Sequence, residues 1–124
     1  MKSLLIPETA YTPKIDFNTN GQLKITGKSL PEDTAVFYEP IIDWMAGCQI
    51  PQIKFTIRLD YMNSSSAHMI SKLLLTAKTN SNLINCDVDW YYETEDEDSY
   101  DFGKEMEYLT DFKFTFYQYA EVPA

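Results

Sequence analysis

The feature that most constrains this chain is an alternating run that breaks off into three serines. From Ile53 to Tyr61, apolar residues alternate with polar ones, which is the period of a strand with one buried face. Behind the serines, apolar residues recur at helical spacing, namely Ile70, Leu73, Leu74 and Ala77. The sequence therefore predicts a strand that leads directly into a helix, with serines 64–66 at the junction.

A second alternating run covers residues 84–92, where apolar side chains again occupy every other position. Strands of a sheet buried on both faces would be continuously apolar instead. We therefore expect an α/β fold of the α+β-like kind, in which helices pack on one face of a mixed sheet. The other face is exposed or covered by a partner.

Turn signals predict how the sheet begins. Residues 14–17 and 22–26 read as strands, and the Asn-Gly pair between them is a strong hairpin signal. An N-terminal hairpin should therefore open the sheet. Residues 1–13, which contain two prolines, are predicted to form an irregular or extended arm.

A helix is predicted after the hairpin. Ser29 and Glu32 have the spacing of a capping box, which places the helix start there. The apolar stripe behind them ends near Gly47, so the helix should end there too. Pro40 lies inside the stripe and is expected to kink the helix, because it removes one hydrogen bond and clashes with the preceding turn.

The end of the chain predicts a short helix and a last strand. The helical pattern covers residues 102–109, and the strand covers residues 112–119 at a sheet edge or beside the hairpin. Three tyrosines, Tyr91, Tyr117 and Tyr119, should lie on the polar face of the sheet. They either mark an interface or are scattered surface residues.

The junction at residues 63–66 suits a negatively charged group. Asn63 or Ser64 should cap the helix with a side-chain oxygen. The remaining N–H groups of the first turn, together with the helix dipole, favour an anion. Phosphorylation there would add about −1.5 to −2 charges without unfolding the chain. The alternative is that the three serines only cap and start a helix.

Residues 60–66, Asp-Tyr-Met-Asn-Ser-Ser-Ser, resemble the Asp/Glu-Tyr-x-Asn-Thr-Ser-Ser signature of the SiaC family of regulatory phosphoproteins. They are also similar, more distantly, to the Tyr-Met-Asp-Ser-Ser stretch of anti-sigma-factor antagonists with the STAS fold. In both groups the hydroxyl residue directly after the Asn or Asp is phosphorylated, and that position is Ser64 here. The SiaC pattern has Thr more often there, so Ser65 and Ser66 remain less favoured alternatives.

Two further segments carry the resemblance over most of the chain. Residues 27–33, Gly-Lys-Ser-Leu-Pro-Glu-Asp, look like the family's Gly-x-Ser-x-Pro-Glu-Asn segment, and residues 90–93, Trp-Tyr-Tyr-Glu, look like its Trp-Tyr-Tyr-acidic block. The resemblance implies a single STAS-like regulatory domain over residues 1–124. It also implies a non-enzymatic role in a bacterial partner-switching pathway.

The resemblance further implies protein partners. A cognate serine/threonine kinase would modify Ser64, a metal-dependent phosphatase would reverse the modification, and the unmodified form would bind the downstream target. In characterised members the target is a diguanylate cyclase, which the family protein activates; this raises cyclic-di-GMP and promotes biofilm formation. The switch surface around Ser64 would then consist of Asp60, Tyr61, Asn63, Ser65, Ser66 and His68.

An acidic segment precedes the last helix, with carboxylates at Glu93, Glu95, Asp96, Glu97 and Asp98. The first interpretation is a solvated loop and helix start, where the dipole favours acidic residues. The second is a docking surface for a basic partner, in which charge speeds encounter and excludes wrong partners. The third is a calcium site, although the EF-hand spacing is absent.

Composition narrows the function classes. A net charge of −9 argues against nucleic acid or an anionic membrane as the main partner. No apolar stretch approaches the roughly 20 residues of a membrane span, so we expect a soluble, cytoplasmic chain. With two cysteines far apart and one histidine, we expect no disulfide framework, metal site or cofactor, and Cys86 should be a buried core thiol.

Catalysis is the alternative function. Ser64 and His68 are four residues apart and could meet on one helical face as a nucleophile and its base, in a small hydrolase or ligand-binding domain. The sequence identifies neither an acid to orient the histidine nor an oxyanion hole. The chain has four glycines and no nucleotide-binding glycine motif. We therefore expect no enzymatic activity.

Overall fold

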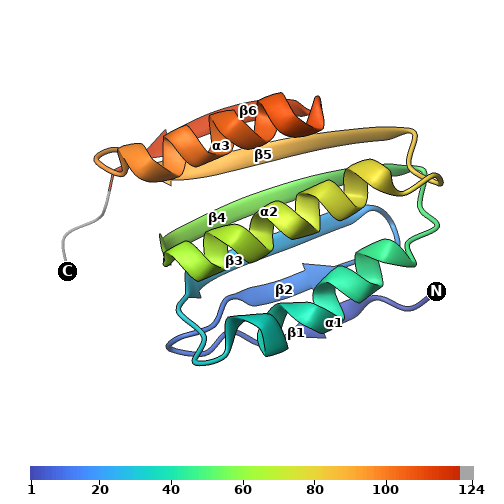
Figure 1. Ribbon diagram of the computed structural model, residues 1–124, viewed down its shortest axis with the longest axis horizontal. Helices are drawn as coiled ribbons and strands as arrows, with labels where there is room; N and C mark the ends of the chain where they lie inside the picture. Colours follow the sequence, from blue (N-terminus) through green and yellow to red (C-terminus); the bar gives the residue numbers. More distant parts are fainter. Residues whose placement is uncertain (121–124) are drawn as a thin grey trace.

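In the computed structural model, which describes residues 1–120, a six-stranded sheet carries three helices on one face (Figure 1). The strands lie in chain order; β2 pairs antiparallel with both β1 and β3, and β3 to β6 are parallel. This is the one-sided mixed sheet that the alternating runs predict. The elements are β1 (Leu4–Ile6), β2 (Lys14–Phe17), β3 (Gln22–Ser29), α1 (Thr34–Ala46), β4 (Gln52–Met62), α2 (Ser64–Thr79), β5 (Asn85–Glu93), α3 (Glu97–Thr110) and β6 (Lys113–Tyr119).

The predicted hairpin is confirmed as β2 and β3. Gly21 ends its turn with φ of +96°, a conformation that glycine adopts at little steric cost, and a Cβ there would collide with the carbonyl of Gln52. The N-terminal arm is only partly as predicted. Residues 4–6 are extended, which is one of the two predicted forms, but they also pair with β2 as the edge strand β1.

The predicted start of α1 is wrong by about one turn. Ser29 is the last residue of β3, and its side chain is fully buried instead of capping a helix. The N-cap is Asp33, whose carboxylate accepts the N–H of Val36 at 3.1 Å. The end of the helix at Gly47 agrees with the prediction, and the helix continues through Pro40.

Strand β4 follows the predicted alternation until a β-bulge interrupts it. Gly27 of β3 pairs with Leu59, but the next β3 residue, Lys28, pairs with Tyr61 and skips Asp60. One extra residue in a strand reverses which face the following side chains point to. Tyr61 was predicted on the buried face, but it is 56% exposed for this reason.

Helix α3 covers β5 and β6. Trp90 of β5 is buried, contacts the ring of Phe102 and donates its indole N–H to the carbonyl of Ser99 at 3.1 Å. Two apolar residues do not reach this core. Ile84 precedes the strand and Leu109 lies on the outer face of the helix, so both side chains are exposed.

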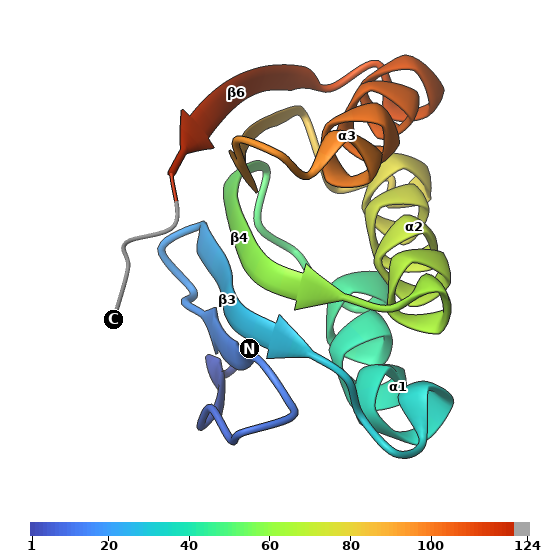
Figure 2. The same ribbon diagram turned by 90° about the vertical axis from the view of Figure 1, so that its left-hand side faces the viewer.

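The uncovered face of the sheet is polar and carries paired aromatic rings, and Figure 2 shows the three helices together on the other side of the curved sheet. Tyr91 and Tyr117 stack with centroids 4.7 Å apart, and the Arg58 guanidinium lies 4.1 Å from the centre of the Tyr119 ring. These tyrosines are therefore packed rather than scattered. Their role as an interface stays a prediction.

Both cysteines are buried thiols, as predicted for Cys86. Burial raises the pKa of Cys86 to about 12, which removes the reactive thiolate at neutral pH. Among the helices of residues 1–120, none has both the length and the apolar character needed to cross a membrane.

Gly103 allows α3 to approach the sheet. A Cβ there would lie 2.8 Å from the Phe116 ring and 2.9 Å from the Trp90 indole. We expect Gly103→Ala to lower the free energy of unfolding by about 1–2 kcal/mol in urea titrations, because overpacking outweighs the better helix propensity of alanine. The control is Gly47→Ala, whose Cβ would meet its nearest atom at 3.7 Å. A Gly103→Ala protein as stable as wild type would contradict this packing.

Candidate functional site

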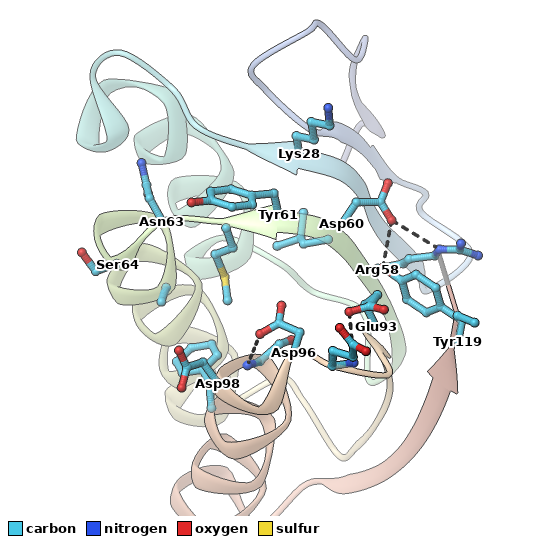
Figure 3. A pocket seen from close by; sticks show the side chains of 17 residues that line it. Lys28, Arg58, Asp60, Tyr61, Asn63, Ser64, Glu93, Asp96, Asp98 and Tyr119 are labelled. Carbon is cyan, nitrogen blue, oxygen red and sulfur yellow. Dashed lines mark hydrogen bonds and ion pairs between the residues drawn. The ribbon is translucent and has the colours of Figure 1, made fainter. Parts of the chain in front are cut away.

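One edge of the sheet collects the ends of the parallel strands and the starts of the helices. Because β3, β4 and β5 run parallel and each leads into a helix on the same face, α1, α2 and α3 all begin at this edge (Figure 1). Ligands of open α/β sheets commonly bind outside the carboxyl ends of the strands. A groove of about 990 Å³ lies here between the starts of α2 and α3 (Figure 3).

The β-bulge positions one end of the groove. Asp60, the unpaired residue, accepts a hydrogen bond from the Tyr119 hydroxyl at 2.9 Å and lies 3.8 Å from the Arg58 guanidinium. Burial and the hydrogen bond to Asp60 raise the pKa of Tyr119 to about 12, so the phenol stays protonated and donates. This cluster ties β6 to β4 across the intervening strand, and Figure 3 shows it at the end of the groove opposite Ser64.

Asn63 organises the start of α2. Its side-chain oxygen accepts the backbone N–H of Ser66 at 2.8 Å and the hydroxyl of Ser65 at 3.1 Å. Its carbonyl accepts the first helical hydrogen bond, from Ala67. Of the two predicted caps, Asn63 rather than Ser64 is therefore the N-cap, and Ser64 becomes the first helical residue.

Ser66 belongs to a buried chain of hydroxyls. Its hydroxyl donates to the carbonyl of Ser29 at 2.9 Å and accepts from the Ser29 hydroxyl at 2.8 Å. The Ser29 proton is thereby used, so Tyr38 must be the donor in its 2.6 Å contact with Ser29. All three side chains are fully buried, and burial raises the pKa of Tyr38 to about 12. A kinase cannot reach Ser66 in this fold.

Ser65 is exposed, but its hydroxyl is occupied. It donates to Asn63 and lies 2.9 Å from the hydroxyl of Thr34, the first residue of α1. Ser64 differs from both neighbours. Its side chain is exposed at the groove, and its hydroxyl has no hydrogen-bond partner among residues 1–120. Of the three predicted candidates, Ser64 has the most accessible hydroxyl.

The acidic segment forms the wall of the groove opposite α2. Four of its five predicted carboxylates line the groove, while Glu97 lies outside it. Two of the four also support local structure: Asp96 caps α3 by accepting the N–H of Ser99 at 3.0 Å, and Glu93 accepts the N–H of Glu95 at 3.0 Å. The first interpretation of these residues, as the start of a helix, is therefore correct for Asp96. It does not exclude a docking role for the wall.

Ser64 and His68 are one helical turn apart on α2 but are not paired as a nucleophile and its base. Ser64 lines the groove, whereas His68 lines a separate hollow along the outer side of α2 with Leu75 and Thr79. No hydrogen bond joins the serine and histidine side chains in the described part of the chain. A general base must lie within hydrogen-bond reach of the proton it takes. This arrangement gives no support to a Ser64–His68 hydrolase.

The geometry also bears on a calcium site. Within residues 1–120, no three Asp, Glu, His or Cys side chains are grouped closely enough to hold a metal ion. Calcium needs six to eight oxygen ligands. The acidic wall is spread along the groove instead of converging on one point.

Several site residues were missed by sequence reasoning. Thr34 and Ser29 contact the serine run from 31 and 37 residues away in the sequence, and Tyr38 contacts Ser29. One signal was available for Ser29: it continues the buried positions of β3 after Leu23 and Ile25, so a polar side chain there needed a buried partner. Nothing in the sequence identifies that partner as Ser66.

The fold and the sequence both match known proteins. A model of the "SiaC family regulatory phosphoprotein" matches residues 6–119. An uncharacterised Pseudomonas aeruginosa protein is 30% identical over 103 residues, which cover 78% of this chain and 81% of the relative.

Solved structures with the same fold include SiaC of Pseudomonas aeruginosa, with a TM-score of 0.81 and 24% identity over 96% of this chain and 100% of that one. Another is the crystal structure of the Pseudomonas aeruginosa diguanylate cyclase SiaD in complex with its activator SiaC. There the TM-score is 0.78, with 24% identity over 94% of this chain and 99% of the matched one.

The buried hydroxyl chain predicts different costs for replacing Ser66 and Ser64. Ser66→Ala removes a donor and an acceptor from a buried network, and we expect it to lower the free energy of unfolding by about 1–3 kcal/mol. Ser64→Ala should change it by less than about 0.5 kcal/mol, because the side chain is exposed and unbonded. Urea titrations of both variants test this. Equal stabilities would contradict a structural role for Ser66.

Proposed function

Because the chain belongs to the SiaC family of regulatory phosphoproteins, we propose that it is a non-enzymatic switch protein in which phosphorylation of Ser64 controls binding to a downstream protein. The observation that carries the proposal is the accessible, unbonded Ser64 hydroxyl at the first position of α2. Ser65 and Ser66 are hydrogen-bonded, and Ser66 is buried.

The start of α2 can accept a phosphate without unfolding. Its first turn contains no acidic side chain, whereas the first turn of α3 already carries Glu97 and Asp98. A phosphate on Ser64 would therefore meet a helix dipole that no carboxylate of the same turn has neutralised. The modification would change the charge of the surface while the fold persists.

The groove explains why the unmodified form would bind the partner. The proposed binding surface consists of Ser64, the exposed ring of Tyr61, and the acidic wall across the groove. A doubly charged phosphate at this surface would have to lose its hydration shell when a partner docks against it. We infer that the wall steers a partner with a basic surface, since it carries Glu93, Glu95, Asp96 and Asp98.

We propose a diguanylate cyclase as the downstream target. This part of the proposal is supported by the Pseudomonas aeruginosa SiaC, which has the same fold and whose structure was solved in complex with the cyclase SiaD that it activates. The role would then be control of cyclic-di-GMP and of biofilm formation, in the cytoplasm. A cognate serine/threonine kinase would phosphorylate Ser64, and a metal-dependent phosphatase would remove the phosphate.

Phosphopeptide mapping tests the modification. We expect protein isolated from the cells that produce it, or incubated with its cognate kinase and Mg-ATP, to carry one phosphate on Ser64. Ser64→Ala should lose the added mass, while Ser65→Ala, the matched control one residue away, should keep it. Modification that persists in Ser64→Ala would contradict the assignment.

Partner binding tests the switch. Ser64→Asp places at the groove a carboxylate that would lose its hydration shell when the partner docks, so we expect it to weaken binding to a cognate diguanylate cyclase at least about tenfold, roughly 1.4 kcal/mol. Ser64→Ala and Ser64→Thr add no charge and should bind like the unmodified protein. Calorimetric titration against the purified cyclase measures all three. The switch model fails if Ser64→Asp and Ser64→Ala bind equally well.

A further inference from the structure

Two residues of α1 hold the serines next to Ser64. Thr34 and Tyr38 are one helical turn apart, so they lie on the same face of α1, the face turned towards α2. Thr34 contacts the hydroxyl of Ser65, and Tyr38 reaches Ser66 through Ser29. This helix face therefore contacts Ser65 directly and Ser66 only through Ser29, and it leaves Ser64 unbound.

The hydrogen bonds of Ser65 have a defined direction. Its own proton goes to the Asn63 oxygen at 3.1 Å, so in the 2.9 Å contact with Thr34 the threonine hydroxyl is the donor. Ser65 thus uses both its donor and one acceptor inside the protein. It must give up these bonds before its oxygen can attack a phosphate.

Ser66 is protected by a stronger barrier. Its side chain has no exposed surface, and its hydroxyl both donates to and accepts from Ser29. Reaching it would require the start of α2 to separate from β3. Burial therefore protects Ser66 from phosphorylation, while hydrogen bonding protects Ser65 from it.

We propose that Thr34 of α1 is a specificity-determining residue that confines phosphorylation to Ser64 by occupying the hydroxyl of Ser65. Tyr38 supports the same arrangement by fixing Ser29 against Ser66. This inference rests on the proposed function, because it concerns which serine the kinase modifies. Exposure alone does not impose the choice, since Ser64 and Ser65 are adjacent and both exposed.

The chemistry of phosphorylation shows how the contacts of Ser65 would slow its modification. The serine oxygen attacks the γ-phosphorus of ATP, the bond between that phosphorus and the β,γ-bridging oxygen breaks, and ADP leaves. The hydroxyl proton passes to a base of the kinase. In Ser65 the hydroxyl donates this proton in a hydrogen bond to Asn63 and accepts a hydrogen bond from Thr34. Both hydrogen bonds must break first. One such bond slows the reaction by about fivefold.

The test is the ratio of phosphate on Ser65 to phosphate on Ser64. Thr34→Val keeps the shape of the side chain and removes its hydroxyl, and we expect this ratio to rise about fivefold. Thr34→Ser restores a hydroxyl and should return the ratio to the wild-type value. The rate at Ser64 should stay within about twofold, because its contacts do not change. Peptide sequencing by mass spectrometry after treatment with the cognate kinase and Mg-ATP gives both numbers.

A stability control separates an effect on the choice of serine from general destabilisation of the fold. Gly103→Ala destabilises α3 and leaves the contacts of Thr34 intact, so it should not alter the ratio. If Ser64 of the wild type is modified but Thr34→Val leaves the ratio unchanged, the role of Thr34 is overturned and the proposed function stands. If no phosphate is found on residues 64–66 of the wild type, the proposed function fails and this inference fails with it.

Discussion

The packing of three helices against one face of the sheet determines where the functional groups of this protein lie. Because β3 to β6 run parallel and a helix connects each pair, α1, α2 and α3 all start at the same edge. The buried faces of the helices supply the core around Phe55, Trp90 and Leu73. Moving a helix start would expose this core, so packing holds Ser64 and the acidic wall in place along one groove.

Two local features refine this frame. The β-bulge at Asp60 turns Tyr61 outward and frees the Asp60 carboxylate to hold Tyr119, which closes one end of the groove. The buried hydroxyl chain then joins α1, β3 and α2 directly beneath Ser64. A bulge and a polar core are both departures from regular structure. Their position beside one exposed serine is consistent with a functional site.

Much of the fold was predictable because its signals are local. The alternation in β4 and β5, the Asn-Gly turn and the serine junction each involve residues close in sequence, and each prediction is confirmed in type if not in boundary. The failures also have physical causes. Ser29 and Glu32 have the spacing of a capping box, but Ser29 does not cap α1. It is the last residue of β3, where its hydroxyl bonds to Tyr38 of α1 and Ser66 of α2. The face of Tyr61 depended on pairing with another strand.

The sequence alone specified a strand that leads into a helix, a cap at Asn63 or Ser64, and a serine run that carries the proposed switch. All three depend on residues that are close together in the sequence. The family resemblance favoured Ser64, but the difference in accessibility among the three serines required the folded molecule. Ser65 is occupied by Thr34, 31 residues away, and Ser66 by Ser29, 37 residues away. Hydrogen bonds between segments so distant form only when packing of the helices on the sheet brings them together, and that packing leaves Ser64 accessible.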